Sequence, residues 1–122
     1  MKVNGGTFNM YGGAIKDGCS LTTATYADKN THGGNVQILG GTFNMYGGEI
    51  SGNDSAAGGA VCLAETKDGV TSVANLYGGI ITGNEAKRGG GVYVYDGGIL
   101  NLSGTKVDGN KASLYGGGIY LK

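Results

Sequence analysis

Residues 5–15 and residues 40–50 have the same sequence except at one position, where Glu49 replaces Ala14. Weaker copies of the same unit occur at residues 75–81 and 101–107. A chain that repeats one short unit at intervals is typical of solenoids, in which each turn contacts only its neighbours. We therefore expect stacked turns rather than a globule around one unique core.

Each unit contains three short segments that predict strands. The first is a Gly-Gly pair followed by residues that alternate in character, at 33–38, 58–63, 89–94 and 116–121. The second is residues 7–11 and its copies, and the third carries one apolar position, filled in turn by Ile15, Ile50, Ile81 and Val107. Period-two alternation over a few residues indicates a half-buried strand, and Gly and Asn supply the corners between strands. No segment has the period of a helix, so almost no helix is expected.

Three strands per unit, with units that recur every roughly 25 to 35 residues, predict an all-β right-handed parallel β-helix of about 4–5 rungs. Residues 1–122 are expected to form a single solenoid domain. Long polar segments interrupt the spacing at 18–32 and 64–72, and these are expected to be insert loops. Residues 1–6 are interpreted as a linker that leads into the first repeat.

Alignment of the repeats predicts which side chains stack in columns. The columns expected to face inward are Val36, Val61, Val92 and Ile119; Ile38, Leu63, Val94 and Leu121; Phe8, Phe43, Ala74 and Leu100; Met10, Met45, Leu76 and Leu102; and the small residues Ala56, Ala86 and Ala112. The columns expected to face solvent are Gln37, Cys62, Tyr93 and Tyr120, and Tyr11, Tyr46 and Tyr77.

Two further columns consist of asparagine. They are Asn9, Asn44, Asn75 and Asn101, and Asn53, Asn84 and Asn110. Stacked amides donate and accept along a column, as in cross-β ladders, so we interpret both columns as structural. A sugar-binding face is the alternative interpretation.

The consensus of the later repeats is Gly-Gly-Gly-(Val/Ile)-Tyr-(Val/Leu), then Leu-Asn-Leu-Ser-Gly, then Gly-Asn-Lys-Ala. This unit resembles the repeats of bacterial and archaeal adhesin-like surface proteins. More distantly, it is similar to the Gly-Gly-Ala-Ile and Phe-x-x-Asn repeats of chlamydial polymorphic outer-membrane proteins. The resemblance covers nearly the whole chain except the two loops. It implies a right-handed β-helix with an extracellular or cell-surface location and a structural or adhesive role.

Composition and charge exclude several functions. Nine basic and nine acidic residues cancel and are scattered, so there is no basic stripe for nucleic acid. No apolar run is long enough for insertion into a membrane. His32 is the only histidine, and with two cysteines it does not make a zinc site, so neither a metal nor a cofactor is expected.

The sequence does not predict an enzyme. Many right-handed β-helices cleave polysaccharides, but that chemistry needs clustered carboxylates, and the nine acids here fall in different columns. Arg88 is the only arginine available as a cationic helper. Ice binding would need regular outward threonines, and the best column (Thr7, Thr42, Ser72 and Ile99) is wrong at two positions. Cys19 and Cys62 either form a disulfide across the outer face or remain two independent thiols.

These observations predict a non-enzymatic, extracellular structural or adhesive solenoid that associates with other copies of itself end to end. A solenoid needs its end turns covered, and no capping segment is recognisable in the sequence. The residues expected to form the self-association contact are Met1, Val3, Phe8, Met10, Ile119, Tyr120, Leu121 and Lys122. The chain is then a subunit of a fibre or a segment of a longer surface adhesin. The alternative is a β-helix that binds or cleaves polysaccharides, with host or environmental glycans as partners.

Overall fold

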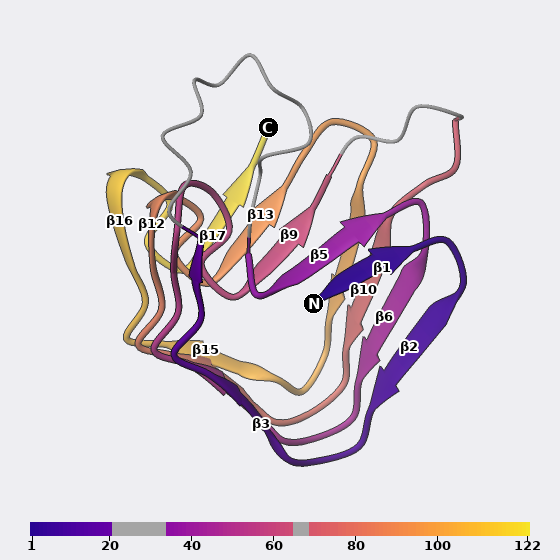
Figure 1. Ribbon diagram of the computed structural model, residues 1–122, viewed down its shortest axis with the longest axis horizontal. Coiled ribbons are helices and arrows are strands. Elements are labelled where there is room, and N and C mark those ends of the chain that lie inside the picture. Colours follow the sequence, from indigo (N-terminus) through magenta and orange to yellow (C-terminus); the bar gives the residue numbers. More distant parts are fainter. Residues whose placement is uncertain (21–33, 65–68) are drawn as a thin grey trace.

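The computed structural model describes residues 1–20, 34–64 and 69–122, which form short strands and turns and no helix. The strands lie in four parallel sheets that surround one interior (Figure 1). Sheet A contains five strands: β1 (Lys2–Asn4), β5 (Val36–Leu39), β9 (Val61–Leu63), β13 (Val92–Val94) and β17 (Ile119–Leu121). Sheet B contains four strands: β2 (Thr7–Met10), β6 (Thr42–Met45), β10 (Val73–Leu76) and β14 (Ile99–Leu102).

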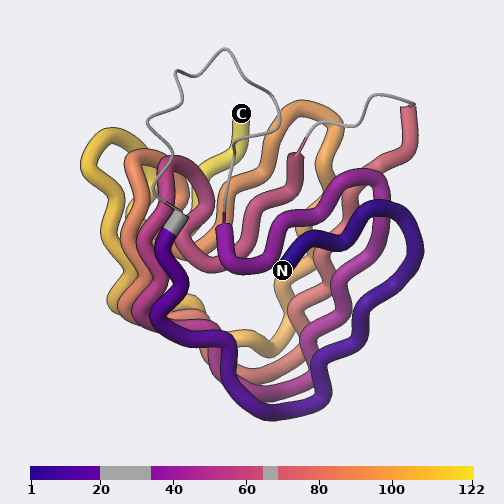
Figure 2. The backbone as a smooth tube through the Cα atoms, viewed as in Figure 1, coloured from indigo at the N-terminus to yellow at the C-terminus, as the bar shows by residue number. Residues whose placement is uncertain are grey.

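The other two sheets also have four strands each. Sheet C contains β3 (Ala14–Lys16), β7 (Glu49–Ser51), β11 (Ile80–Thr82) and β15 (Lys106–Asp108). Sheet D contains β4 (Cys19–Ser20), β8 (Asp54–Ser55), β12 (Glu85–Arg88) and β16 (Lys111–Tyr115). Seen from the N-terminal turn, the chain runs clockwise as it recedes from the viewer, so the coil is right-handed (Figure 2). The predicted right-handed parallel β-helix is therefore confirmed.

Each turn contains one more strand than the sequence predicts, because sheet D was not recognised. Its strands are short, and β4 and β8 have only two residues each. They follow directly after the Gly or Asn of a corner, and the longer strands β12 and β16 have only the small Ala86 and Ala112 at their paired inward position, so the sequence pattern does not reveal them. Part of the predicted insert loop 18–32 is consequently strand β4, and residues 21–32 of that loop lie outside the described residues.

Most predicted inward columns are in register in the structure. Val36 pairs with Val61, Phe8 with Phe43, and Ile50 with Ile81. The central members of these columns are fully buried and form one core cluster. Two positions are corrected: Ser55 rather than Ala56 lies beside Ala86, and Val73 rather than Ser72 lies beside Thr42.

The N-terminal residues are not a linker, as the sequence interpretation had it. They form β1, in which Lys2 lies beside Gln37 and Val3 beside Ile38. The sequence contains a pattern that predicts β1, because Gly5-Gly6-Thr7 after this strand matches Gly40-Gly41-Thr42 after β5. The apolar alternation of β1 was too short to be recognised without that match.

The column of Gln37, Cys62, Tyr93 and Tyr120 lies on the outer face of sheet A, as its register predicts, but it is not exposed as expected. The chain leaving sheet D turns back over this face, and Ala57 packs with Cys62 and Tyr93 in a second, smaller core. The ring centroids of Tyr93 and Tyr120 are 5.5 Å apart. Tertiary packing therefore converts an outward face into a buried one.

Candidate functional site

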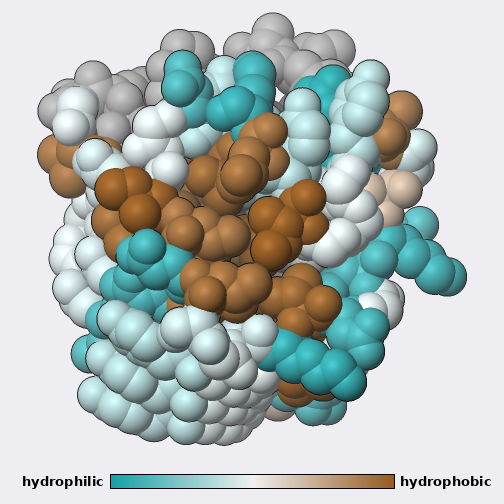
Figure 3. Space-filling model, turned by 180° about the vertical axis from the view of Figure 1, so that it is seen from behind, coloured by the Kyte–Doolittle hydropathy of each residue, from teal (hydrophilic) through white to brown (hydrophobic). Residues whose placement is uncertain are grey.

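The C-terminal end of the coil is open and apolar. Strands β14, β15, β16 and β17 form its last layer, and each has one edge without a neighbouring strand in the described part of the chain. Leu102 faces inward but is 45% exposed, whereas Leu76, one turn earlier in the same column, is completely buried. Figure 3 shows hydrophobic residues gathered on this end of the molecule. An apolar layer with free strand edges is a template for another layer of strands.

The N-terminal end is open too, but its inward side chains are better covered. Val3 and Met10 are buried, while Phe8 and Ile15 are partly buried against the core. Tyr11, on the outer side of this turn, is 73% exposed. The two ends therefore differ, and the C-terminal end exposes more apolar surface.

The eight residues predicted for self-association fall into two groups at opposite ends of sheet A and its neighbour sheet B. Met1, Val3, Phe8 and Met10 belong to the first turn, and Ile119, Tyr120, Leu121 and Lys122 follow the last complete one. Within one chain the two groups do not meet. Sequence reasoning missed Ile99, Leu102 and Leu114, which are exposed at the C-terminal end. Their position in the last repeat would have been enough to predict that they lie at this end.

The first asparagine column is a hydrogen-bonded ladder with a direction. The Nδ2 atom of Asn44 donates to Oδ1 of Asn9, Asn75 donates to Asn44, and Asn101 donates to Asn75, each over 2.8 Å. Within the described residues, Nδ2 of Asn9 and Oδ1 of Asn101 are left without a partner. The ladder therefore ends in a donor at one end of the coil and an acceptor at the other.

The second asparagine column is buried and runs in the opposite sense. Nδ2 of Asn53 donates to Oδ1 of Asn84 over 2.7 Å, and Nδ2 of Asn84 donates to Oδ1 of Asn110 over 2.9 Å. The first turn has Gly18 in this column, and the Asn35 amide occupies the space that a side chain there would fill. It donates to Asn53, so Asn35 completes the ladder, a role that the sequence did not reveal.

The outer face of sheet B carries regular columns and no charge. Thr7, Asn9 and Tyr11 alternate outward from the first strand, and the same types recur in the second. The ring centroids of Tyr11 and Tyr46, and of Tyr46 and Tyr77, are 5.0 Å apart. None of the four strands of this sheet contains an ionisable Asp, Glu, Lys, Arg or His.

Other sheets carry the charged side chains. On sheet C, Nζ of Lys16 lies 2.9 Å from a carboxylate oxygen of Glu49. The bonds that Lys16 and Ser51 donate lower the pKa of the Glu49 carboxyl. The uncharged face of sheet B is thus a local property of this protein and not one of its whole surface.

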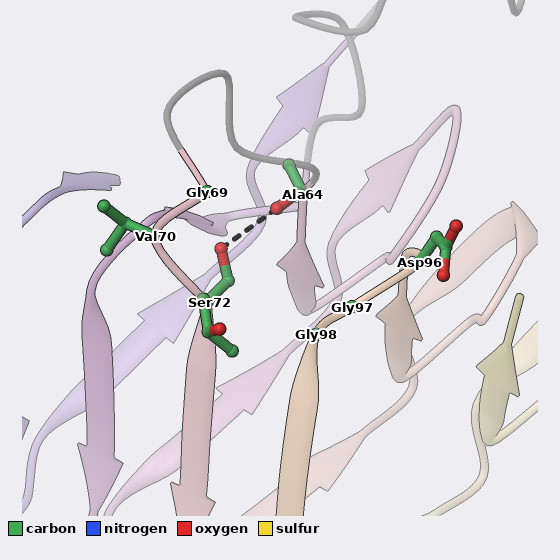
Figure 4. Close-up of a pocket in the computed structure, with 8 residues that line it drawn as sticks. Ala64, Gly69, Val70, Ser72, Asp96, Gly97 and Gly98 are labelled. Atoms are coloured by element: carbon green, nitrogen blue, oxygen red, sulfur yellow. Dashed lines mark hydrogen bonds between the residues drawn. The ribbon is translucent and has the colours of Figure 1, made fainter.

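A shallow groove of about 200 Å³ lies where sheets A and B meet (Figure 4). Its described lining residues are Ala64, Gly69, Val70, Thr71, Ser72, Asp96, Gly97 and Gly98. Oγ of Ser72 donates to the carbonyl of Ala64 over 3.0 Å. Asp96 is the one carboxylate among these described lining residues, whereas polysaccharide hydrolysis commonly uses a pair of carboxylic acids. Among the described residues no three candidate metal ligands lie together, and His32 is outside them.

Both cysteines are free thiols in the structure. Cys19 is exposed in the first strand of sheet D, whereas Cys62 is buried beneath the chain that crosses sheet A. Burial raises the pKa of the Cys62 thiol to about 12, because the thiolate loses its hydration. Cys62 is consequently unreactive at neutral pH.

Thiol labelling tests this difference. At pH 8 we expect the native chain to react rapidly through Cys19 alone, and to show a second reactive thiol only after unfolding in guanidinium chloride. The measurement is the stoichiometry of a chromogenic disulfide reagent, with Cys19→Ser as the control that should leave no fast phase. A native chain with no reactive thiol, and two after reduction, would instead indicate a disulfide.

The geometry defines a class of protein: a parallel β-solenoid with open, unlike ends and, on sheet B, an outer face without charged residues. The chain matches no protein-family model, no curated protein and no solved structure. A search of the described residues for a helix able to cross a membrane found none.

Proposed function

We propose that this protein is a non-enzymatic, extracellular structural and adhesive β-solenoid whose ends associate with another coil. The observation that carries the proposal is the C-terminal end, where inward-facing apolar residues and strand edges are exposed. In the first asparagine ladder, an acceptor ends the last turn and a donor ends the first. These ends are complementary, so a head-to-tail contact continues the coil. Because such a contact does not close on itself, it produces a filament.

The surface location and the adhesive role rest on the resemblance of the repeats to those of adhesin-like surface proteins. In one version the chain is the subunit of a fibre, and in the other it is a segment of a longer adhesin. The intact mass of the native material distinguishes them, because the subunit has a mass of 12.2 kDa and the segment belongs to a far heavier chain.

Gly12 provides a test of the end contact. A Cβ atom at Gly47 would lie 2.7 Å from the carbonyl oxygen of Tyr11 in the preceding turn, and one at Gly104 would lie 2.1 Å from that of Tyr77. Gly12 occupies the same position in the first turn, where a Cβ meets nothing within 4 Å. In a head-to-tail stack, Gly12 would face Ser103 of the preceding copy in the same tight contact.

We therefore expect Gly12→Ala to fold like the parent and to associate only at higher concentration. The overpacking cost raises the concentration for half-association by about tenfold to a hundredfold. Analytical ultracentrifugation over a concentration series measures the shift, and electron microscopy distinguishes fibres from discrete particles. Asp54→Asn, on the exposed side of the second turn, is the matched control and should associate like the parent. A parent chain that stays monomeric at high concentration contradicts the proposal.

The outer face of sheet B favours a second function, binding of an uncharged polysaccharide. Its amide ladder leaves hydrogen-bonding capacity directed outward, and the stacked tyrosines offer ring edges and hydroxyl groups at regular intervals. A face without charges suits a neutral glycan better than an acidic one.

Affinity electrophoresis in gels that contain neutral or acidic polysaccharides tests this second function. We expect retardation by a neutral polysaccharide, weakened several-fold by Tyr46→Ala and unchanged by Tyr115→Ala, which removes a ring from sheet D. No reducing ends should be released during the binding experiment. Cleavage that disappears with Asp96→Asn would contradict the non-enzymatic assignment.

A further inference from the structure

Sheet A has five strands, whereas sheets B, C and D have four each. The first turn begins with β1, and β17 begins a fifth turn that the chain does not complete. A second copy added at the C-terminal end must therefore start its own first turn at the level that β17 already occupies. Two strands, β17 of one copy and β1 of the next, compete for one place in the stack.

The register shows that the two strands are equivalent. Val3 lies beside Ile38, Ile38 beside Leu63, Leu63 beside Val94, and Val94 beside Leu121, so they form one inward column. Tyr120 and Lys2 are likewise members of the outward column that includes Cys62. In a continuous stack only one of the two strands can lie beside β5 of the second copy.

β17 fits this place better than β1. Inside the coil the outward column is buried, and Cys62 and Tyr93 have almost no exposed surface. Tyr120 suits that environment, because its ring stacks on those of Tyr93 and Tyr115. β1 would instead bring Lys2, whose ammonium group would lose its hydration there without a partner.

We propose that two copies join by strand exchange: β17 of one copy replaces β1 of the next on the edge of β5. This inference rests on the end-to-end association proposed above. In the joined coil, β2, β3 and β4 of the second copy lie beside β14, β15 and β16 of the first. Lys122 follows β17 and takes the place of Asn4, directly before Gly5 and Gly6 of the second copy. Nδ2 of Asn9 then donates to Oδ1 of Asn101 across the junction.

In the separate chain, β1 lies on the same edge of β5 that β17 of another copy would occupy. The backbone N–H of Gln37 donates to the carbonyl of Met1 over 2.8 Å, and that of Gly5 donates to Leu39 over 3.1 Å. This pairing must open before exchange, so it lowers the fraction of chains that are competent to join. Deletion of residues 1–4 removes the competitor and should lower the concentration for half-association by about tenfold.

Disulfide trapping distinguishes exchange from simple stacking. In a Cys19→Ser, Cys62→Ala background, the double variant Leu39→Cys and Lys122→Cys places one thiol on β5 and one after β17. Within one chain, β9 and β13 separate these strands, so a disulfide between them reports contact between copies. The matched control, Asn4→Cys and Lys122→Cys, reports β1 of one copy lying beside β17 of another.

On mild oxidation we expect the Leu39→Cys, Lys122→Cys chain to form a ladder of disulfide-linked oligomers, and the control to form few. Trapping of the control instead shows that β1 stays in place, which overturns the exchange but retains end-to-end association. Association without trapping in either variant also overturns the exchange. A chain that stays monomeric in every variant, the deletion included, overturns both the exchange and the proposed function.

Discussion

Ile81→Asp is expected to prevent folding. Ile81 is completely buried in β11, between Ile50 and Val107 of the neighbouring strands. An unpaired carboxylate at this place costs about 3 to 5 kcal/mol or more. Since domains of this size are stable by only roughly 5 to 15 kcal/mol, the variant should be largely unfolded or melt far below the parent. Circular dichroism during thermal and urea unfolding measures the loss.

Ile80→Asp is the matched control, because it makes the same change at the preceding residue of the same strand. Ile80 is half-buried on the outer side of sheet C, beside Lys106. The carboxylate there stays hydrated, and Lys106 on one neighbouring strand offsets the like charge of Glu49 on the other, so we expect a change within about 1 kcal/mol. If both variants unfold alike, the assignment of the inward and outward sides of sheet C is wrong.

Gly78→Ala is expected to destabilise the coil strongly for a single added methyl group. Its Cβ would lie 2.4 Å from the carbonyl oxygen of Tyr46, which belongs to the neighbouring turn and is held by strand pairing. The turns must then separate locally, at a cost of about 1 to 3 kcal/mol or more. The measurement is the free energy of unfolding in urea.

Gly12→Ala makes the same substitution at the equivalent position of the first turn, where nothing lies within 4 Å. It should leave the stability unchanged or raise it by about 0.4 to 1 kcal/mol, because alanine restricts the unfolded chain. Equal losses in both variants would show that the backbone conformation, and not contact between turns, requires glycine here.

The repeat predicted the architecture because register in a solenoid follows from alignment. Phe8 aligns with Phe43 and Asn9 with Asn44 in the sequence, and the same pairs lie side by side in sheet B. One turn placed on another brings equivalent residues together, because each turn of a solenoid follows the path of the turn before it. Sequence comparison alone therefore located most of the interior columns and the exposed tyrosine column.

Three features depended on the tertiary structure. In sheet D, β4 and β8 have two residues each, and β12 and β16 have only the small Ala86 and Ala112 at the paired inward position, so only the pairing of whole turns reveals the sheet. Cys62 and Tyr93 alternate outward in sequence, yet the chain returning from sheet D covers them, because burial depends on what packs against a face. Asn35 fills the space beside Gly18 across a long sequence separation.

The two ends of the coil, which form the candidate site, were likewise predicted partly from the sequence and decided partly by the tertiary structure. The sequence predicted eight residues for the two ends, and it missed Ile99, Leu102 and Leu114 at the C-terminal end. The structure decided that β1 is a strand and that sheet A has one strand more than the other sheets. Alternation within one strand is a local property that sequence determines. The number of strands at each level of the coil depends instead on which edges find partners, and only the assembled turns decide that.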